Sequence, residues 1–266
     1  MSIDIREIAG EHAKKYPVGV QAIIAIADIL EKNNLLPKRF PHKNETHLSE
    51  CRNKMGSAIL RYNTEFHTPE LITETWQSAF DLWVANAAEK GLRLLDIEVP
   101  MLEKEQDVLE KPINDVPTMM MFYPAELEGK SGLLSLGKIF PALHITNKEN
   151  TDIQNVKGDP GWLNVEAALN SPNLNSTEYQ LEEYFNNLGR IGMNLNMYIL
   201  LSQFMKLIRG KFIDTKRGSR LLSTTDEGRV IGACFRDNGA LSHDIIYPRN
   251  TIDSLGGRSV QLIQKA

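Results

Sequence analysis

The feature that most constrains the fold is a change in the spacing of apolar residues along the chain. Before residue 91, and again between residues 163 and 209, apolar residues recur every three or four positions, as in amphipathic helices. Over the last fifty residues they alternate with polar residues, as in strands with one buried face. Asn238-Gly239 separates two of the alternating runs and strongly favours a β-hairpin. The sequence therefore predicts an α+β protein.

Two of the predicted helices carry end signals as well as periodicity. Thr68 is a suitable N-cap, and Pro69 follows at the first helical position, where its missing N–H costs nothing. Gly91 would end this helix. A second helix is expected to begin after Asn194 and to end just before Gly210.

The predicted layout begins with a mainly helical region that ends in a short mixed α/β segment, and continues with a second helical block and a four-stranded antiparallel meander. We expect two regions, residues 1–160 and 161–266, and leave open whether they are separate domains. The four meander strands are predicted at Arg220–Thr224, Arg229–Arg236, Leu241–Tyr247 and Arg258–Gln264. Shorter strands are predicted over residues 92–97, 118–123 and 139–145, and shorter helices over residues 101–111, 163–169 and 177–188.

The composition restricts the class of protein. The chain has 266 residues, 42% of them hydrophobic, and a net charge of −4, which suits a protein that buries a core and argues against general nucleic-acid binding. Its two cysteines, Cys51 and Cys234, are too few for a disulfide framework or a four-thiolate zinc site. No signal peptide and no apolar run long enough to span a membrane are evident. We therefore expect a cytoplasmic protein.

Charge is unevenly distributed along the chain. Residues 96–128 hold nine acidic residues and two lysines, a local charge of −7. Residues 206–236 hold eight basic and three acidic residues, a local charge of +5. Such patches can steer an acidic partner, or can let two copies of one chain associate. The candidate binding residues are Arg209, Lys211, Lys216, Arg217, Arg220 and Arg258, the last of which follows Gly256-Gly257 in a possible anion-binding nest.

The predicted hairpin register gives one catalytic hypothesis. With a two-residue turn at Asn238-Gly239, Cys234 would face His243 across a non-hydrogen-bonded pair, with Cβ atoms about 4.5–5.5 Å apart. An imidazole at that distance could activate the thiol as a nucleophile. A small buried cysteine is the more ordinary interpretation. A one-residue bulge in the turn would place the two side chains on opposite faces.

The function that the sequence favours is a non-enzymatic, intracellular interaction or assembly protein that uses its acidic and basic patches. The alternative is a Cys/His-dependent hydrolase or transferase that uses Cys234 and His243. A protein partner or self-association is expected. Nucleic acid is a weaker candidate through residues 206–236, because aromatic side chains that would stack on bases are not interleaved with the charges. No cofactor motif and no metal-ligand pattern is recognised.

Overall fold

The computed structural model describes residues 42–89, 97–103, 109–144, 153–154, 158–225 and 227–266. The chain divides into two compact units, residues 1–46 and 47–266. Nearly all of the first unit lies outside the described residues, so the fold is that of the second unit. Most of the strand predicted over residues 92–97, and much of the helix predicted over residues 101–111, also lie outside the described part.

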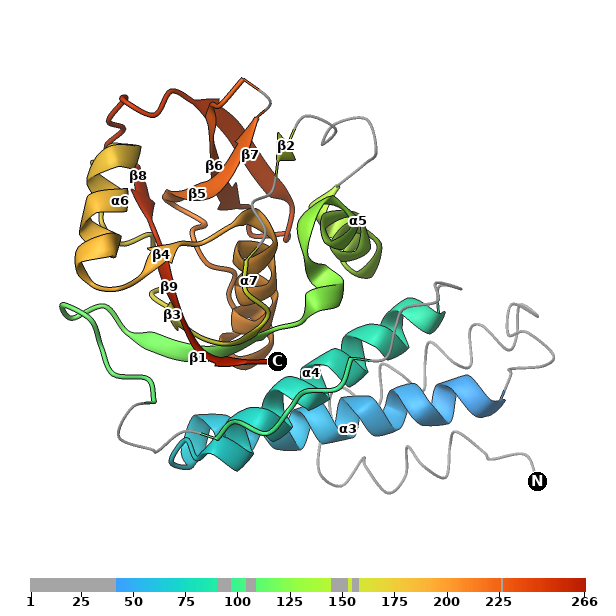
Figure 1. The fold of residues 1–266 in the computed structure, drawn as a ribbon. Helices are drawn as coiled ribbons and strands as arrows, with labels where there is room; N and C mark the ends of the chain where they lie inside the picture. Colours follow the sequence, from blue (N-terminus) through green and yellow to red (C-terminus); the bar gives the residue numbers. More distant parts are fainter. Residues whose placement is uncertain (1–41, 90–96, 104–108, 145–152, 155–157, 226) are drawn as a thin grey trace. The chain divides into compact units, whose positions relative to one another are not determined.

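The predicted α+β class is confirmed (Figure 1). The helices are α3 (His42–Thr64), α4 (Pro69–Glu89), α5 (Gly129–Ile139), α6 (Glu178–Asn187) and α7 (Leu195–Arg209), with short 3₁₀ turns η2 (Ala125–Leu127) and η3 (Pro141–Leu143). The strands are β1 (Thr118–Tyr123), β2 (Ile153–Gln154), β3 (Gly161–Glu166), β4 (Ile191–Gly192), β5 (Gly218–Thr225), β6 (Val230–Phe235), β7 (Leu241–Ile246), β8 (Leu255–Gly257) and β9 (Ser259–Lys265).

The strands form two sheets instead of the single C-terminal meander that the sequence suggested. The first sheet is antiparallel, in the order β1-β3-β9-β4. Strands from before and after residue 160 therefore share one sheet. Every residue of β1 and β3 is buried, so these two strands form part of the core. The last predicted strand does form, as β9, but it lies between β3 and β4.

The second sheet contains the other part of the predicted meander. Its order is β2-β5-β6-β7, with antiparallel pairing, and β8 lies beside β5 in parallel. Three of the four predicted meander strands are thus confirmed as neighbours. The fourth was assigned to the wrong sheet, because alternation predicts a strand and its buried face but not its partner.

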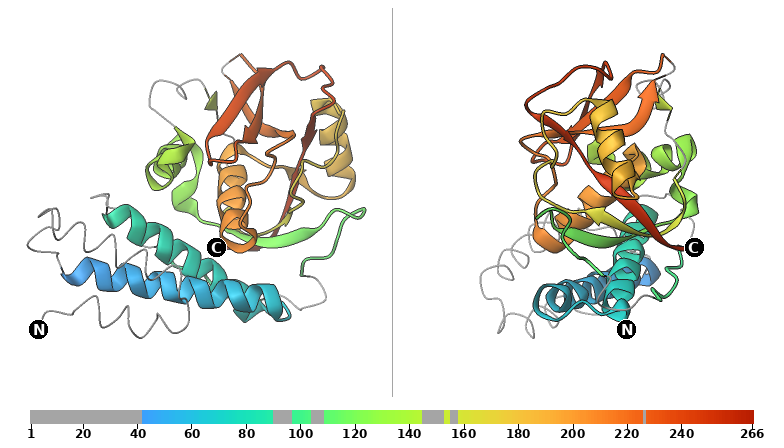
Figure 2. Two further views of the ribbon diagram at one scale, coloured as in Figure 1. Left: turned by 180° about the vertical axis from the view of Figure 1, so that it is seen from behind. Right: turned by 60° about the vertical axis from the view of Figure 1, so that its left-hand side comes forward.

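Helix α7 forms the centre of the core and contacts β1 of the first sheet and β5 of the second. The view from behind shows this helix, in orange, between green β1 and the orange-red strands of the second sheet (Figure 2). Its Phe204 ring stacks on Trp76 of α4, with centroids 3.8 Å apart. The Trp76 indole Nε1 donates to Met120 O of β1 at 2.9 Å. One aromatic pair therefore joins α4, α7 and the first sheet.

The predicted ends of both helices are confirmed where they are described. Leu71 N donates to Thr68 Oγ1 at 3.2 Å, one residue before Pro69 opens α4. Asn194 accepts from Met197 N at the start of α7, and Gly210 ends that helix in a left-handed conformation. The end predicted at Gly91 lies outside the described residues.

Two short elements were predicted as the wrong type. Residues 163–169 were expected to be helical, but residues 161–166 form β3. Residues 139–145 were expected to form a strand, but α5 ends at Ile139 and η3 follows it. Periodicity cannot separate a short buried strand from a buried helical turn, because both give runs of apolar residues. None of the helices in the described part of the chain is long and apolar enough to cross a bilayer.

Candidate functional site: a lysine-lined cavity

A cavity of about 480 Å³ lies at the C-terminal end of α7. Three lysines border it: Lys206 from the last turn of α7, and Lys211 and Lys216 from the loop that follows. Asp237, from the β6–β7 turn, is the one acidic residue at its edge. We call this site the lysine-lined cavity. Its other lining residues are Leu169, Asn170, Gly210, Phe212 and Thr215.

An aromatic stack fixes one side of this cavity. The Phe212 ring is parallel to that of Phe235 in β6, with centroids 5.6 Å apart. The Lys206 ammonium lies 5.0 Å from the centroid of Phe212, a cation–π arrangement. Lys206 Nζ also donates to Gly210 O at 2.9 Å, where it neutralises the negative end of the α7 dipole. Lys206 is therefore held in place by the helix end and by the ring.

The loop between α7 and β5 is fixed to the core at its middle. Ile213 is fully buried, and its N–H donates to Ser202 Oγ at 3.3 Å. The next residue, Asp214, donates its N–H to Leu169 O at 2.8 Å. Because these two residues point inward, Lys211 and Lys216 on either side of them project from a fixed backbone.

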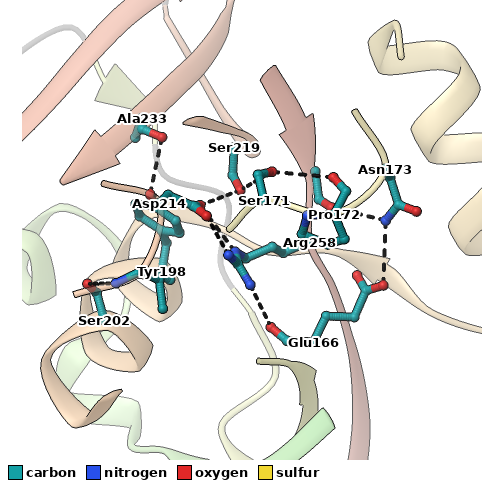
Figure 3. A network of polar contacts seen from close by, with 12 residues as sticks. Glu166, Ser171, Pro172, Asn173, Tyr198, Ser202, Asp214, Ser219, Ala233 and Arg258 are labelled. Atoms are coloured by element: carbon teal, nitrogen blue, oxygen red, sulfur yellow. Dashed lines mark hydrogen bonds and ion pairs between the residues drawn. The ribbon is translucent and has the colours of Figure 1, made fainter. Parts of the chain in front are cut away.

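The Asp214 carboxylate is the centre of a buried polar network (Figure 3). It forms a fully buried ion pair with Arg258, the residue between β8 and β9. It also accepts from Ser219 Oγ at 2.7 Å and from Tyr198 OH at 3.1 Å. Asp214 has a positive φ of 54°, a conformation that aspartate tolerates better than most residues. These contacts join α7, the loop, β5 and β9 below the cavity.

The network continues beyond Asp214 towards the first sheet. Arg258 Nη1 donates to Glu166 O of β3 at 3.1 Å. The Glu166 carboxylate is fully buried and accepts from Ser259 N. Ser171 and Ser219 share a hydrogen bond of 2.8 Å. The loop that carries the lysines is thus anchored to both sheets.

Lys211 and Lys216 are exposed, and neither ammonium has an ion-pair partner among the residues that the structure describes. Three lysines against one aspartate leave the cavity positively charged. An exposed ammonium gains little from a single anion in water, but several around one hollow act together on a partner with several negative groups. The arrangement suits an extended acidic ligand better than a compact apolar one.

The six predicted binding residues divide into two groups. The first group is exposed and consists of Arg209, Lys211, Lys216 and Arg217. Of these four, Lys211 and Lys216 border the lysine-lined cavity. Arg220 and Arg258 are only 2% and 0% exposed, so their predicted place on a basic surface is wrong. Both donate hydrogen bonds to protein oxygens, which is how a guanidinium is accommodated in a core. The region around Gly256-Gly257 forms β8 and does not remain an open nest.

The predicted pairing of Cys234 with His243 is also wrong. Cys234 pairs with Ser242, and His243 pairs with Ala233. The turn has three residues instead of two: Arg236 N donates to Ala240 O at 2.9 Å, and Gly239 has a φ of 87°. This one-residue shift puts the Cys234 and His243 side chains on opposite faces of the hairpin.

The environment of Cys234 does not favour a reactive thiolate. The thiol is half-buried, and this burial raises its pKa, which the Ser242 hydrogen bond lowers only in part. It borders a cavity of about 230 Å³ to which His243 does not contribute. The geometric basis for a Cys/His nucleophile is therefore absent.

Sequence reasoning missed a pair that the fold brings together from distant segments. His67 Nδ1 contacts the Glu110 carboxylate, and its Nε2 lies 2.6 Å from Tyr62 O. Tyr62 OH also donates to Glu110, at 2.8 Å. The hydrogen bond to Glu110 raises the pKa of His67. Both ring nitrogens face acceptors, an arrangement that favours the protonated imidazole. No local sequence motif indicates this pair.

The acidic patch is less concentrated in the fold than in the sequence. Asp96, Glu105 and Asp107 lie outside the described residues. Of the others, Glu110 forms an ion pair with His67 and accepts a hydrogen bond from Tyr62, and Glu128 is half-buried. The acidic residues of this segment that are exposed are Glu98, Glu103, Asp115 and Glu126.

No group of three histidine, cysteine, aspartate or glutamate side chains that could hold a metal ion occurs within the described ranges. Comparison of the chain with protein-family models, with curated proteins and with solved structures finds no match.

Proposed function

We propose that this protein works inside cells as a non-enzymatic interaction or assembly protein, and that it binds an acidic segment of a partner protein in the lysine-lined cavity. One observation carries the proposal: Lys211 and Lys216 project from a loop that Ile213 and Asp214 fix to the core, and they converge with Lys206 on one cavity. A fixed loop loses little conformational freedom on binding, so its charges are presented at low entropic cost.

The proposal takes a protein as the partner for two reasons. Phe212, the aromatic ring at the cavity, is stacked on Phe235 on one side and contacts Gly239, so it is not free to stack on successive bases. The exposed carboxylates Glu98, Glu103, Asp115 and Glu126 give a second copy of this chain the charge that the cavity would attract. Self-association is therefore one form that the interaction can take.

Binding of a fluorescent decaglutamate peptide tests the proposal. Fluorescence anisotropy would be measured in 50 mM and 300 mM NaCl with the unmodified chain and with the double variant K211E/K216E. We expect binding that weakens with salt, and at least a tenfold loss of affinity in the variant, equivalent to about 1.4 kcal/mol. Analytical ultracentrifugation of the same two proteins would show whether the two lysines also support self-association.

The matched control is K54E/K138E, which makes the same change in net charge at two exposed lysines outside the cavity. This control should bind within about twofold of the unmodified chain. Equal losses in both variants would mean that only net charge matters. The contrary result would be a single-stranded oligonucleotide that binds more tightly than the peptide and loses affinity equally in K211E/K216E. That result would indicate that the partner is a nucleic acid and not a protein.

A further inference from the structure

A second cavity, separate from the lysine-lined cavity, lies between α6 and the strands β4 and β5 and measures about 170 Å³. We call it the α6 pocket. Its apolar wall includes Leu181 and Phe185 of α6 and Leu222 of β5, and Ile191 stands at its edge, 49% exposed. Three ionisable residues, Glu178, Glu182 and Arg220, also border it. An engineered apolar cavity of about 150 Å³ holds benzene, so this pocket has room for one small ring.

Glu178 and Arg220 each have one buried side-chain atom without a hydrogen-bond partner in the described structure. Arg220 is almost completely buried; its Nε donates to Ser176 O at 3.0 Å, and its Nη2 donates to Asn250 O. Its Nη1 has no partner. The same holds for Glu178 Oε2, which is likewise shielded from solvent. A donor and an acceptor thus remain unsatisfied on the border of one cavity.

Such atoms are uncommon in folded proteins, because a buried polar group without a partner loses its hydration and gains nothing in return. Glu178 and Arg220 attract each other electrostatically, yet no hydrogen bond or ion pair joins these two described residues. A molecule that presented one acceptor and one donor would satisfy both. Both atoms are closed to solvent and Glu178 is only half-buried, so binding of such a molecule requires a change of the Glu178 rotamer, a common response to binding.

We propose that the α6 pocket binds a small neutral carboxamide with an aromatic or compact aliphatic body. Its carbonyl oxygen accepts from Arg220 Nη1, and its N–H donates to Glu178 Oε2. Its body lies against Leu181, Phe185 and Leu222. A carboxamide carries both groups on one carbon, which a simple alcohol, ketone or hydrocarbon does not.

The charges around the pocket favour a neutral amide over a carboxylate at neutral and higher pH. Burial raises the pKa of Glu178 to about 7, while Arg220 lowers it and Glu182 raises it further. Above pH 7 Glu178 is therefore mostly ionised and would repel a carboxylate. The charged groups that face Glu178 are Arg220 from β5 and Glu182 from its own helix. Below pH 7 a protonated Glu178 could donate to a carboxylate instead.

Binding of benzamide, benzoate and toluene to the full chain tests the proposal, with the dissociation constants measured by ligand-observed NMR at pH 6.0 and pH 8.0. We expect benzamide to bind most tightly at pH 8.0. In the variant E178L its affinity should fall at least about tenfold, since a hydrogen bond to a charged group is lost. E183L is the matched control, because Glu183 is exposed on the same helix and does not border the pocket; it should bind benzamide as the unmodified chain does.

Melting temperatures would confirm that both variants fold. Toluene that bound as tightly as benzamide, or an equal loss of benzamide affinity in E178L and E183L, would overturn the proposal. Absence of benzamide binding to the unmodified chain would also overturn the proposal. Benzoate that bound more tightly than benzamide at both pH values would overturn the assignment of a neutral amide.

Discussion

The basic residues that the sequence suggested for partner binding reach opposite environments in the fold. Lys211 and Lys216 are exposed at a cavity, whereas Arg220, only a few residues further along, and Arg258 are almost completely buried. Both of these buried residues are arginines, whose planar, weakly hydrated guanidinium offers several donors to fixed acceptors. The exposed ones at the cavity are lysines, whose compact ammonium is strongly hydrated. A count of charge along the chain therefore does not distinguish a binding surface from a structural network.

The difference also separates stability from binding. The Arg258–Asp214 pair holds the loop after α7, whereas Lys211 and Lys216 on that loop have no ion-pair partner among the described residues. Changes to the buried arginines should alter the free energy of unfolding, and changes to the lysines should alter binding alone. The following variants test that division.

The largest effect is expected for Arg258→Met. This variant leaves the Asp214 carboxylate buried without its cation, and loss of one partner of a buried pair costs about 3–5 kcal/mol. Urea unfolding followed by circular dichroism measures the change. In the double variant R258M/D214N the uncompensated charge is gone, so part of the loss should be recovered. A single variant as stable as the unmodified chain would show that the network is not structural.

A smaller effect is expected for Arg220→Lys. Lysine keeps the charge but cannot reproduce the two hydrogen bonds that the guanidinium donates to Ser176 O and Asn250 O. We expect a loss of about 1–3 kcal/mol in the free energy of unfolding. The variant R217K serves as the control, because Arg217 is exposed. Equal stability of R220K and R217K would contradict the distinction between buried and exposed cations.

The raised pKa of Glu178 should make the stability of the protein depend on pH. Burial raises its pKa from 4.5 to about 7, so between these values the folded chain binds more protons than the unfolded chain. The stabilising effect of the proton is present below pH 4.5 and is lost as the pH rises through 7. E178Q should remove about 1–2 kcal/mol of this dependence, allowing for partial exposure. Melting curves of both proteins at pH 5 and pH 8 would reveal it, and parallel pH profiles would refute it.

The smallest effect on stability is expected for Lys211→Met and Lys216→Met. Neither ammonium has an ion-pair partner among the described residues, so each change should stay within about 0.5 kcal/mol. Urea unfolding under the conditions used for Arg258→Met gives the direct comparison. A loss near that of Arg258→Met would mean that the lysines belong to the structural network.

Local signals allowed the best predictions from sequence. The ends of α7 follow from Asn194 and Gly210, because a cap requires only neighbouring backbone groups. The hairpin was predicted at the correct place, yet its register was wrong by one residue. Asn238-Gly239 fits either a two-residue turn or a three-residue turn with a bulge, and Gly239 takes the left-handed conformation of the second.

Features that depend on distant segments could not be predicted in this way. The place of β9 between β3 and β4 depends on which strand edges are free and on contacts with distant residues, such as the hydrogen bond from Arg190 Nε to Ser259 Oγ at 2.7 Å. The basic cluster was visible in the sequence, but the burial of Arg220 depends on the carbonyl groups of Ser176 and Asn250. The α6 pocket likewise combines Glu178 with Arg220, and their spacing in the sequence matches no motif.

The interior position of β9 has a consequence for synthesis on the ribosome. Ser259, where β9 begins, comes 93 residues after Glu166, where β3 ends. At roughly 5–20 residues per second, one edge of β3 stays unpaired for about 5–20 seconds after it has been made. During that interval β3, a strand that is buried in the folded protein, presents free N–H and C=O groups to neighbouring nascent chains. Chaperones that shield unpaired strand edges should therefore increase the yield of this protein.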